Sequence, residues 1–273
     1  SGGFNYAFGS TGQISNGSTI RTIDISDLHW EETAQFNLGF DTRLMQDFNL
    51  TFEFFNKKTS GILQRVRVPG YTGVSESPWA NVADMTNKGI EIELGYKKTI
   101  GKLNIAANAN FSTLKNEVTN IGNGVDFITQ DAAGFQSMGE VTRTQVGESV
   151  NSFYGFQTAG IFQNQAEIDA YTNSTGGLIQ PDAVPGDFRW VDNNGDGQIT
   201  NDDKKFLGSP LPKYTFGFSL NLDYKGFDFY VFTQGVAGNK IFQGYRRLDV
   251  SEANFTAEAL GRWTGEGTSN SYP

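Results

Sequence analysis

One run of acids and amides has the composition and spacing of a calcium-binding loop. In residues 192–203, side chains with oxygen atoms stand at the first, third and fifth positions, and Gly197 at the sixth permits a sharp turn. The template adds a backbone carbonyl at the seventh position and a carboxylate at the twelfth. The predicted Ca²⁺ ligands are therefore Asp192, Asn194, Asp196, the carbonyl of Gln198, and Asp203.

This loop departs from an EF-hand in two respects. Its twelfth residue is Asp rather than Glu, and residues 188–191 before it have an extended rather than a helical pattern. The predicted role of calcium is therefore to stiffen an outer loop, and not to signal. The alternative interpretation is an Asn/Gly turn whose acids are simply solvated.

Other kinds of chemistry find little support. The chain has no cysteine and one histidine, His29, which excludes thiol nucleophiles, Cys-ligated zinc and sites with several histidines. Acidic pairs such as Glu31-Glu32 and Asp202-Asp203 are common on wet surfaces, so they are weak candidates for glycosidase carboxylates. We expect the protein not to be an enzyme.

The composition excludes further classes. Phe accounts for 23 of 273 residues, yet only 19% are charged and the mean hydropathy is −0.40. This mixture is unlike a Leu/Ala-rich helical bundle and unlike a disordered chain, which would be poor in aromatics. A net charge of −9 disfavours a nucleic-acid partner, because such binding relies on clustered Lys and Arg. No apolar stretch reaches the roughly 18 residues of a transmembrane helix.

The elements that must position these residues are strands, because apolar and polar residues alternate with a period of two nearly everywhere. The longest run is Tyr214–Tyr224, in which Phe216 and Phe218 share one face and Thr215 and Ser219 the other. Similar runs occupy Thr33–Asp41, Asn49–Lys58, Lys88–Lys97, Leu103–Thr113 and Phe227–Gln234. Runs of about 9–11 residues have the length of tilted membrane-spanning strands. Helical periodicity is confined to a short turn around Gln165–Tyr171.

The connections between these runs alternate between short and long. Short turns follow Asp41, Lys97 and Tyr224, whereas long polar segments follow Lys58 and Thr113. This rhythm is typical of outer-membrane barrels, which have short periplasmic turns and long extracellular loops. We assign residues 114–212 to one long extracellular region that contains the calcium-like loop. Both ends of the region lie on the same side, so it contains zero or two crossings; we favour two, with Thr142–Phe162 supplying at least one.

The sequence therefore predicts an all-β fold, an antiparallel transmembrane β-barrel segment with long extracellular loops. Polar strand faces suit a wet lumen, apolar faces suit lipid, and aromatic residues gather at strand ends, where interfacial girdles lie. The alternative fold is a large antiparallel sheet with one face on a core.

The sequence also resembles the barrel of SusC/RagA-type TonB-dependent transporters of Bacteroidota. The resemblance rests on motifs that run in order along nearly the whole chain: Leu28–Thr33, Asn37–Asp41, Phe54–Leu63, Asn87–Glu91, Lys115–Val118, Ser152–Phe156, Gly160–Phe162, Pro185–Phe188, Gly208–Tyr214, Gln234-Gly235, Gly238-Asn239 and Arg262–Thr264. It implies a parent protein several times longer, with a signal peptide, a TonB box, an N-terminal plug and a barrel of 22 strands. Residues 1–273 are then part of the barrel domain, about eight to ten strands without the plug or the last strands.

The resemblance further implies a function. The parent would import a large nutrient, such as an oligosaccharide or a peptide, across the cell outer membrane. Its partners would be a SusD-like surface lipoprotein that acts as a lid, TonB acting through the plug, and the membrane lipid. This chain would form part of the barrel wall and of the lid-binding rim.

Two other functions stay open. One is an outer-membrane barrel with a structural or adhesion role in a surface or secretion assembly, which a parent gene without a plug or TonB box would favour. The other is a soluble calcium-binding β-rich carbohydrate-binding module, which predicts that the chain folds in buffer without detergent.

Overall fold

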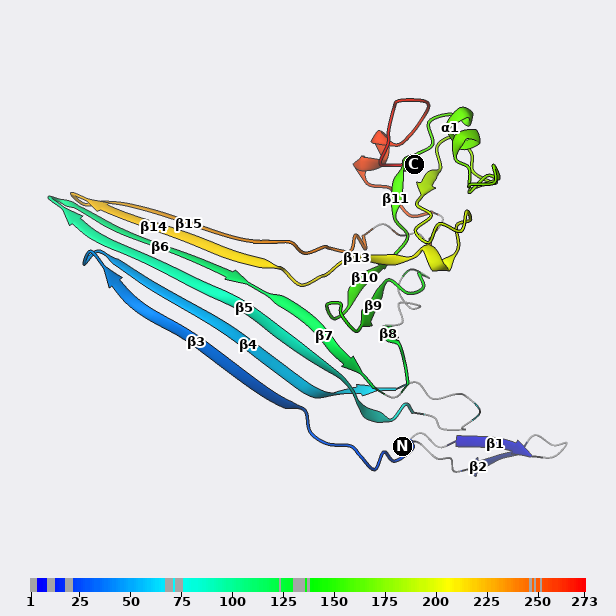
Figure 1. Cartoon of the computed structure of the whole chain (residues 1–273), viewed down its shortest axis with the longest axis horizontal. Coiled ribbons are helices and arrows are strands. Elements are labelled where there is room, and N and C mark those ends of the chain that lie inside the picture. Colours follow the sequence, from blue (N-terminus) through cyan, green and yellow to red (C-terminus); the bar gives the residue numbers. More distant parts are fainter. Residues whose placement is uncertain are drawn as a thin grey trace.

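The computed structural model describes residues 4–8, 13–17, 22–66, 71, 76–122, 124–129, 136, 138–245, 247, 249–250 and 252–273 (Figure 1). It consists of one long antiparallel sheet with a lobe of short elements at one end. A separate hairpin near the N-terminus pairs β1 (Phe4–Phe8) with β2 (Gln13–Gly17).

The long sheet confirms the predicted all-β antiparallel fold. Its strands are β3 (Glu32–Leu44), β4 (Phe48–Arg65), β5 (Trp79–Ile100), β6 (Leu103–Thr113), β14 (Tyr214–Tyr224) and β15 (Phe227–Ala237). Each strand pairs with the next in this order, and β7 (Lys115–Ile121) extends the sheet beside the first half of β5. Within the described chain the sheet is open, with β3 and β15 at its edges.

The predicted rhythm of connections is confirmed. The three tight turns lie together at one end of the sheet, called here the turn end, and the long connections lie at the other, the loop end (Figure 1). The turn between β14 and β15 consists of Lys225 and Gly226, both with positive φ, of 52° and 84°. Such turns match the right-handed twist of paired strands, and glycine adopts the required conformation without strain.

Two expectations about the strands are wrong. The favoured pair of crossings is absent from the described residues between Thr113 and Tyr214, because β6 and β14 are direct neighbours along all eleven residues of each strand. The predicted crossing at Thr142–Phe162 instead forms short strands of the lobe. The described sheet therefore holds six long strands and β7, fewer than the eight to ten expected.

The register places whole rows of apolar side chains on one face of the sheet. One row runs through Phe40, Phe52, Ile92, Phe111 and Phe216, each directly opposite the next. We call this side of the sheet the apolar face and the opposite side the polar face. The side chains of the apolar face remain uncovered, with Leu38 64% and Phe229 56% exposed, so this face contributes little to a protein core.

The lobe consists of short elements between β7 and β14. Strands β8 (Phe127–Thr129), β9 (Thr142–Gln145), β10 (Ser152–Gly155) and β13 (Lys205–Gly208) form one small sheet, and β11 (Thr158–Ile161) pairs with β12 (Phe188–Trp190). The predicted short helix is confirmed as α1 (Gln165–Ala170), and a 3₁₀ turn, η2 (Asn201–Asp203), precedes β13. A further 3₁₀ turn, η3 (Ala257–Gly261), follows β15.

Buried apolar contacts gather at the loop end. Ala80, Val82 and Ala83 of β5 form a small cluster, against which side chains such as Ile62 pack. A second group, Ile161, Phe162, Ile168 and Ile179, is buried in the lobe. The chain after β15 returns to this group: the amide oxygen of Asn270 accepts from the Ile161 N–H at 2.8 Å.

Candidate functional site

The calcium-like loop lies in the lobe, between β12 and β13. Strand β12 ends at Trp190, and η2 supplies the last three loop residues before β13 begins. The loop packs against a neighbouring turn, because a Cβ atom on Gly197 would lie 2.5 Å from the Cβ of Asn173. Gly197 has a φ of 84°, so both its backbone and its surroundings require glycine.

The predicted ligands fold the loop through hydrogen bonds to its own backbone. The carboxylate of Asp192 accepts from the N–H groups of Gly195 and Gly197 at 2.7 and 2.8 Å. Asn194 accepts from the N–H of Asp196 at 2.9 Å, and Asp196 accepts from the N–H of Gln198 at the same distance. Each of these oxygens retains a further lone pair.

Asp203 is the only predicted ligand that is fully buried, with 0% of its surface exposed. Its carboxylate accepts from the backbone N–H of Asn193 at 2.8 Å and from that of Thr200 at 2.7 Å, and thereby joins the two ends of the loop. Burial by itself raises the pKa of this carboxyl, but the hydrogen bonds from backbone N–H groups outweigh it and hold the pKa below its usual value. Asp203 is therefore held as a carboxylate.

The structure thus brings Asp192, Asn194, Asp196, Gln198 and Asp203 into one compact loop. Across the described chain, however, no three His, Cys, Asp or Glu side chains converge as a metal site would require. The donor set itself, carboxylate and carbonyl oxygens on a flexible loop, is of the kind that Ca²⁺ takes.

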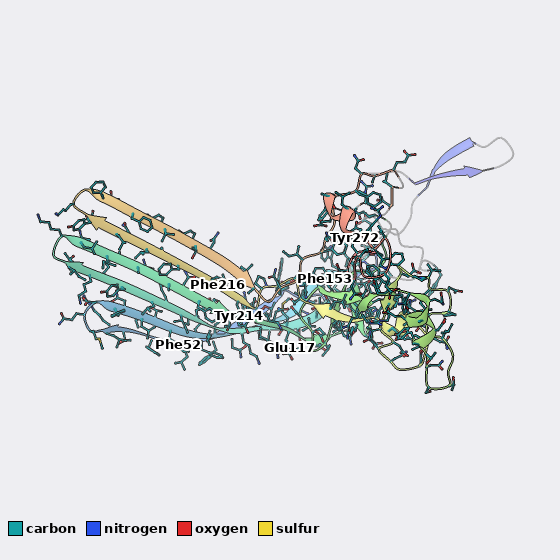
Figure 2. The ribbon with its side chains drawn as sticks, turned by 90° about the horizontal axis from the view of Figure 1, so that it is seen from above. Phe52, Glu117, Phe153, Tyr214, Phe216 and Tyr272 are labelled. Atoms are coloured by element: carbon teal, nitrogen blue, oxygen red, sulfur yellow. The ribbon has the colours of Figure 1, made fainter. Side chains whose placement is uncertain are left out.

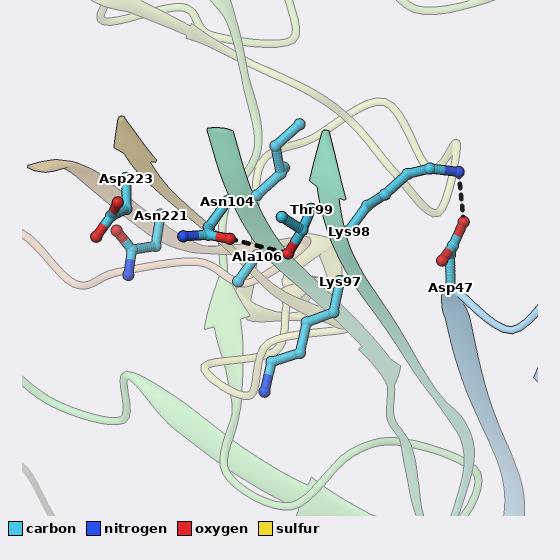
Figure 3. A pocket seen from close by; sticks show the side chains of 9 residues that line it. Asp47, Lys97, Lys98, Thr99, Asn104, Ala106, Asn221 and Asp223 are labelled. Atoms are coloured by element: carbon cyan, nitrogen blue, oxygen red, sulfur yellow. Dashed lines mark hydrogen bonds and ion pairs between the residues drawn. The ribbon is translucent and has the colours of Figure 1, made fainter. Parts of the chain in front are cut away.

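The polar face of the long sheet carries a second set of candidate residues. Rows of acids, amides and hydroxyls cross it, including Asp41, Thr51, Glu93 and Asn110 in direct register. At the turn end a cavity of about 320 Å³ lies among Lys97, Thr99, Asn104, Asn221 and Asp223 (Figure 3). These side chains could line a water-filled channel and bind a polar solute or another polar surface.

The apolar face has a clear border at each end. At the turn end, Lys98 lies in a row with Ile105 and Leu222, and its ammonium group is 2.6 Å from the carboxylate of Asp47 (Figure 3). At the loop end, Lys88 continues the face two residues beyond Ile90. Figure 2 shows the side chains of the long sheet projecting from both of its faces.

Sequence reasoning missed a cavity at the loop end, in the notch where β7 and the segment before β14 separate. Next to this notch the Leu114 N–H donates a hydrogen bond to the Lys213 carbonyl, at 2.9 Å. Beyond it lies a cavity of about 550 Å³, whose lining includes Lys88, Lys115 and Tyr214. Alternation places Lys88 on the apolar face, but only the register shows that Lys115 is opposite it.

Comparisons with known proteins agree with this architecture. Residues 1–178 match the family model described as TonB dependent receptor-like, beta-barrel. Among relatives, TonB-dependent receptor P26 of Formosa agariphila is 35% identical over 94% of this chain, and TonB-dependent receptor P3 of the same organism is 30% identical over 94%. TonB-dependent receptor SusC of Bacteroides thetaiotaomicron is 25% identical over 88%.

The chain spans about a quarter of the length of these relatives: 26% of P3 and of P26, and 22% of SusC. Among solved structures, it is similar to the RagAB peptide importer in the "open-open" state, with a TM-score of 0.64 and 22% identity over 87% of this chain and 23% of that one. The "closed-closed" state gives a TM-score of 0.62 over 86% and 24%. At this identity the structural likeness shows the fold alone.

No helix in the described part of the chain is long and apolar enough to cross a membrane. The matched family model covers well over half of the 273 residues, and it agrees with the paired strands and the alternating faces. The resemblance seen in the sequence is confirmed, and the chain belongs to the TonB-dependent receptor-like β-barrel family.

Proposed function

We propose that this chain is part of the barrel wall of an outer-membrane transporter that imports a large nutrient. The observation that carries the proposal is the division of one long open sheet into an uncovered apolar face and a polar face. On β14 the apolar face runs from Tyr214 to Tyr224, or ten steps of about 3.3 Å. A strand tilt of about 40° reduces this length to about 25 Å, the height of the apolar band on such barrels.

The same division argues against the soluble carbohydrate-binding module. Such a module would leave rows of Phe and Leu in contact with water, over an area much larger than the patches that soluble monomers expose. Lipid on this face and a water-filled lumen on the other satisfy both sets of side chains. The family relationship also supports a transport role over an enzymatic one.

The loop end is proposed to be extracellular, because barrels of this kind carry their long loops outside and their tight turns in the periplasm. The lobe would then form part of the rim on which a SusD-like lipoprotein lid closes. Energy would come from TonB acting through a plug elsewhere in the parent protein. The names of the similar proteins, SusC and the RagAB peptide importer, support this assignment by analogy.

The proposed substrate is an oligosaccharide or a peptide. The test is uptake by cells with and without the intact parent gene, offered a panel of labelled oligosaccharides and peptides. Deletion of the gene should abolish uptake of one class, and loss of TonB should do the same. Undiminished uptake of every class, with the protein present in the outer membrane of the parent strain, would contradict the proposal.

We further propose that residues 192–203 bind Ca²⁺ and that the ion stiffens the lobe. Support comes from the ligand spacing, from Gly197 at the sharp turn and from Asp203, which is buried as a carboxylate. Asp192, Asn194, Asp196 and Asp203 would supply side-chain oxygens and Gln198 its carbonyl. Bound calcium would add cross-links between the first half of the loop and η2.

The test is the double variant Asp192→Ala/Asp196→Ala of the full-length protein. It should bind calcium more weakly, and cleavage of the loop near Trp190 should become insensitive to EDTA. The control is Asp182→Ala, which removes an acid of the lobe outside the loop. The proposal fails if calcium titrations of the double variant and the control coincide, or if EDTA leaves cleavage of the unmodified loop unchanged.

A further inference from the structure

Lysines mark the border of the apolar face at the loop end. Lys88 lies on this face because it is two residues before Ile90 on β5, and its register partners are Asn56 on one side and Lys115 on the other. Lys58 belongs to the next row, opposite Thr86. We call Lys58, Lys88 and Lys115 the border lysines. They lie just beyond the row that contains Ile90 and Phe54.

The border lysines carry more positive charge than the paired carboxylate beside them neutralises. Lys88 and Lys115 are directly opposite on paired strands, where Cβ atoms lie about 4.5–5.5 Å apart and like charges are destabilising. Glu117 is 2.5 Å from the ammonium group of Lys115. In the described part of the chain, no carboxylate lies within ion-pair distance of Lys58 or Lys88.

The lowered pKa of Glu117 indicates a positive electrostatic potential around the border lysines. The hydrogen bond from Lys115 and the charge of that lysine lower the pKa of Glu117, and the charge of Lys88 lowers it further. Glu117 is therefore held ionised by Lys115, and among the described residues no carboxylate pairs with Lys88. An additional anion would relieve the repulsion between Lys88 and Lys115.

The cavity in the notch provides space for such an anion. It is about 550 Å³ and adjoins both Lys88 and Lys115. Ser209 adds a hydroxyl group to its lining, Leu114 adds apolar surface, and one acid, Glu148, also lines it. A group that fits must combine negative charge with hydrogen-bond acceptors, as a phosphate does.

We propose that the border lysines and this cavity bind the phosphate of an anionic lipid headgroup in the outer leaflet. The lipid, and not a free phosphate, is the chosen occupant because Lys88 and Tyr214 lie on the apolar face itself. Acyl chains packed along that face bring their headgroup to the level of Lys88. Lysine stems lie along apolar surface while their ammonium groups reach the polar layer. This inference rests on the proposed membrane position of the sheet.

The experiment uses the full-length protein in phosphatidylcholine vesicles that contain diphosphorylated lipid A. The test variant is Lys88→Gln/Lys115→Gln, and the matched control is Lys57→Gln/Lys225→Gln, which removes the same charge from the polar face and from the turn between β14 and β15. Binding of the phosphorylated lipid should weaken about fivefold for each border lysine removed, because a basic residue near an anionic lipid surface contributes about that factor. The control should bind as the parent does.

Three results would overturn the inference. Equal lipid binding by the test variant and the control would mean that the border lysines are not the site. Equal binding of dephosphorylated lipid A would mean that phosphate is not recognised. Displacement of the lipid by inorganic phosphate alone would indicate a site for the free anion. If the protein inserts and imports normally in these cases, only this inference fails; absence from the outer membrane would instead contradict the proposed function.

Discussion

At the scale of single residues, Asp203 organises the lobe. It is a buried charge, and such a charge is stable only where hydrogen-bond donors surround it. The donors are the N–H groups of Asn193 and Thr200, so one side chain fixes the beginning of the loop to its end. The backbone carbonyl of Asp203 also accepts from the Asn193 side chain, at 2.6 Å. The chain passes from Asp203 directly into β13 and then into β14.

Replacement of Asp203 by alanine should loosen the loop. The partly buried N–H groups of Asn193 and Thr200, and the more distant N–H of Asn194, would lose their acceptor, at a local cost of about 3 kcal/mol. The measurement is hydrogen exchange of residues 188–213 in the full-length protein, which should become about a hundredfold faster. Asp202→Ala is the control, because Asp202 is the adjacent acid and is exposed, whereas Asp203 is buried. Equal exchange in both variants would contradict the role given to Asp203.

The same carboxyl predicts a dependence on pH. Its pKa is lower in the folded protein than the ordinary 3.8, so its stabilising effect is complete above about pH 5 and is lost as pH falls through the folded pKa. The difference in protection between the parent and Asp203→Asn should therefore be constant near neutral pH and shrink below about pH 5. The check is hydrogen exchange at several pH values, corrected for the intrinsic rate at each. A difference that grows on acidification would contradict the assignment.

At the scale of elements, glycines on the polar face set how closely the strands of the long sheet approach. A Cβ atom on Gly89 of β5 would collide with the carbonyl of Thr113 and lie 2.8 Å from the ring of Phe55. Phe55 is directly opposite Gly89 and covers the space that a side chain would occupy. The Ile90 N–H also donates to the Thr113 hydroxyl at 3.0 Å. The last residue of β6, Thr113, therefore lies so close to Gly89 of β5 that this position has no room for a side chain.

Gly89→Ala should weaken the sheet at this point by about 1–3 kcal/mol, because the extra methyl group meets backbone atoms that cannot move aside. Gly95→Ala on the same strand and face is the control. The nearest atom to its Cβ would be the amide oxygen of Asn108, at 3.3 Å, and that side chain can turn away; atoms of Asn49 would lie at an ordinary 3.9 Å. The measurement is the urea midpoint of the full-length protein in detergent. Equal midpoints for the two variants would contradict the argument.

At the scale of the whole molecule, the two faces of the sheet decide how it lies in its surroundings. Phe218 and Ser219 are neighbours in the middle of β14 and project to opposite sides. One side is mostly apolar between the border lysines and Lys98, with Thr42 and Thr233 at the ends of the row that contains Leu94. The other side carries most of the amides, hydroxyls and acids. A sheet of this kind fits a wall between lipid and water.

Phe218→Arg should therefore impair insertion, and Ser219→Arg should not. A charged side chain on the lipid face near the bilayer midplane costs about 2–4 kcal/mol, whereas one in the lumen is solvated. The measurement is the folding free energy of the full-length protein in phospholipid vesicles. An equal loss for both variants would mean that the two faces meet the same environment, against the proposed position.

The sequence by itself determined the strands and their faces. Strands β6 and β14 have the same bounds as the alternating runs Leu103–Thr113 and Tyr214–Tyr224, because alternation is a local property with a period of two. The rhythm of short and long connections also placed the turns together at one end. The spacing of the proposed calcium ligands in residues 192–203 could also be recognised in the sequence, because it is a pattern within one short segment.

Only the tertiary structure decided which strands are neighbours and which side chains meet. The direct pairing of β6 with β14 removes the crossings expected between them, and the strands of the lobe, at three or four residues, are too short for alternation to distinguish. The facing of Lys88 and Lys115, and the burial of Asp203, likewise depend on register and packing. The facing of the two lysines results from the pairing of strands that are distant in sequence, and the burial of Asp203 results from the folding of its loop upon itself. A pattern of residue types along one segment contains neither.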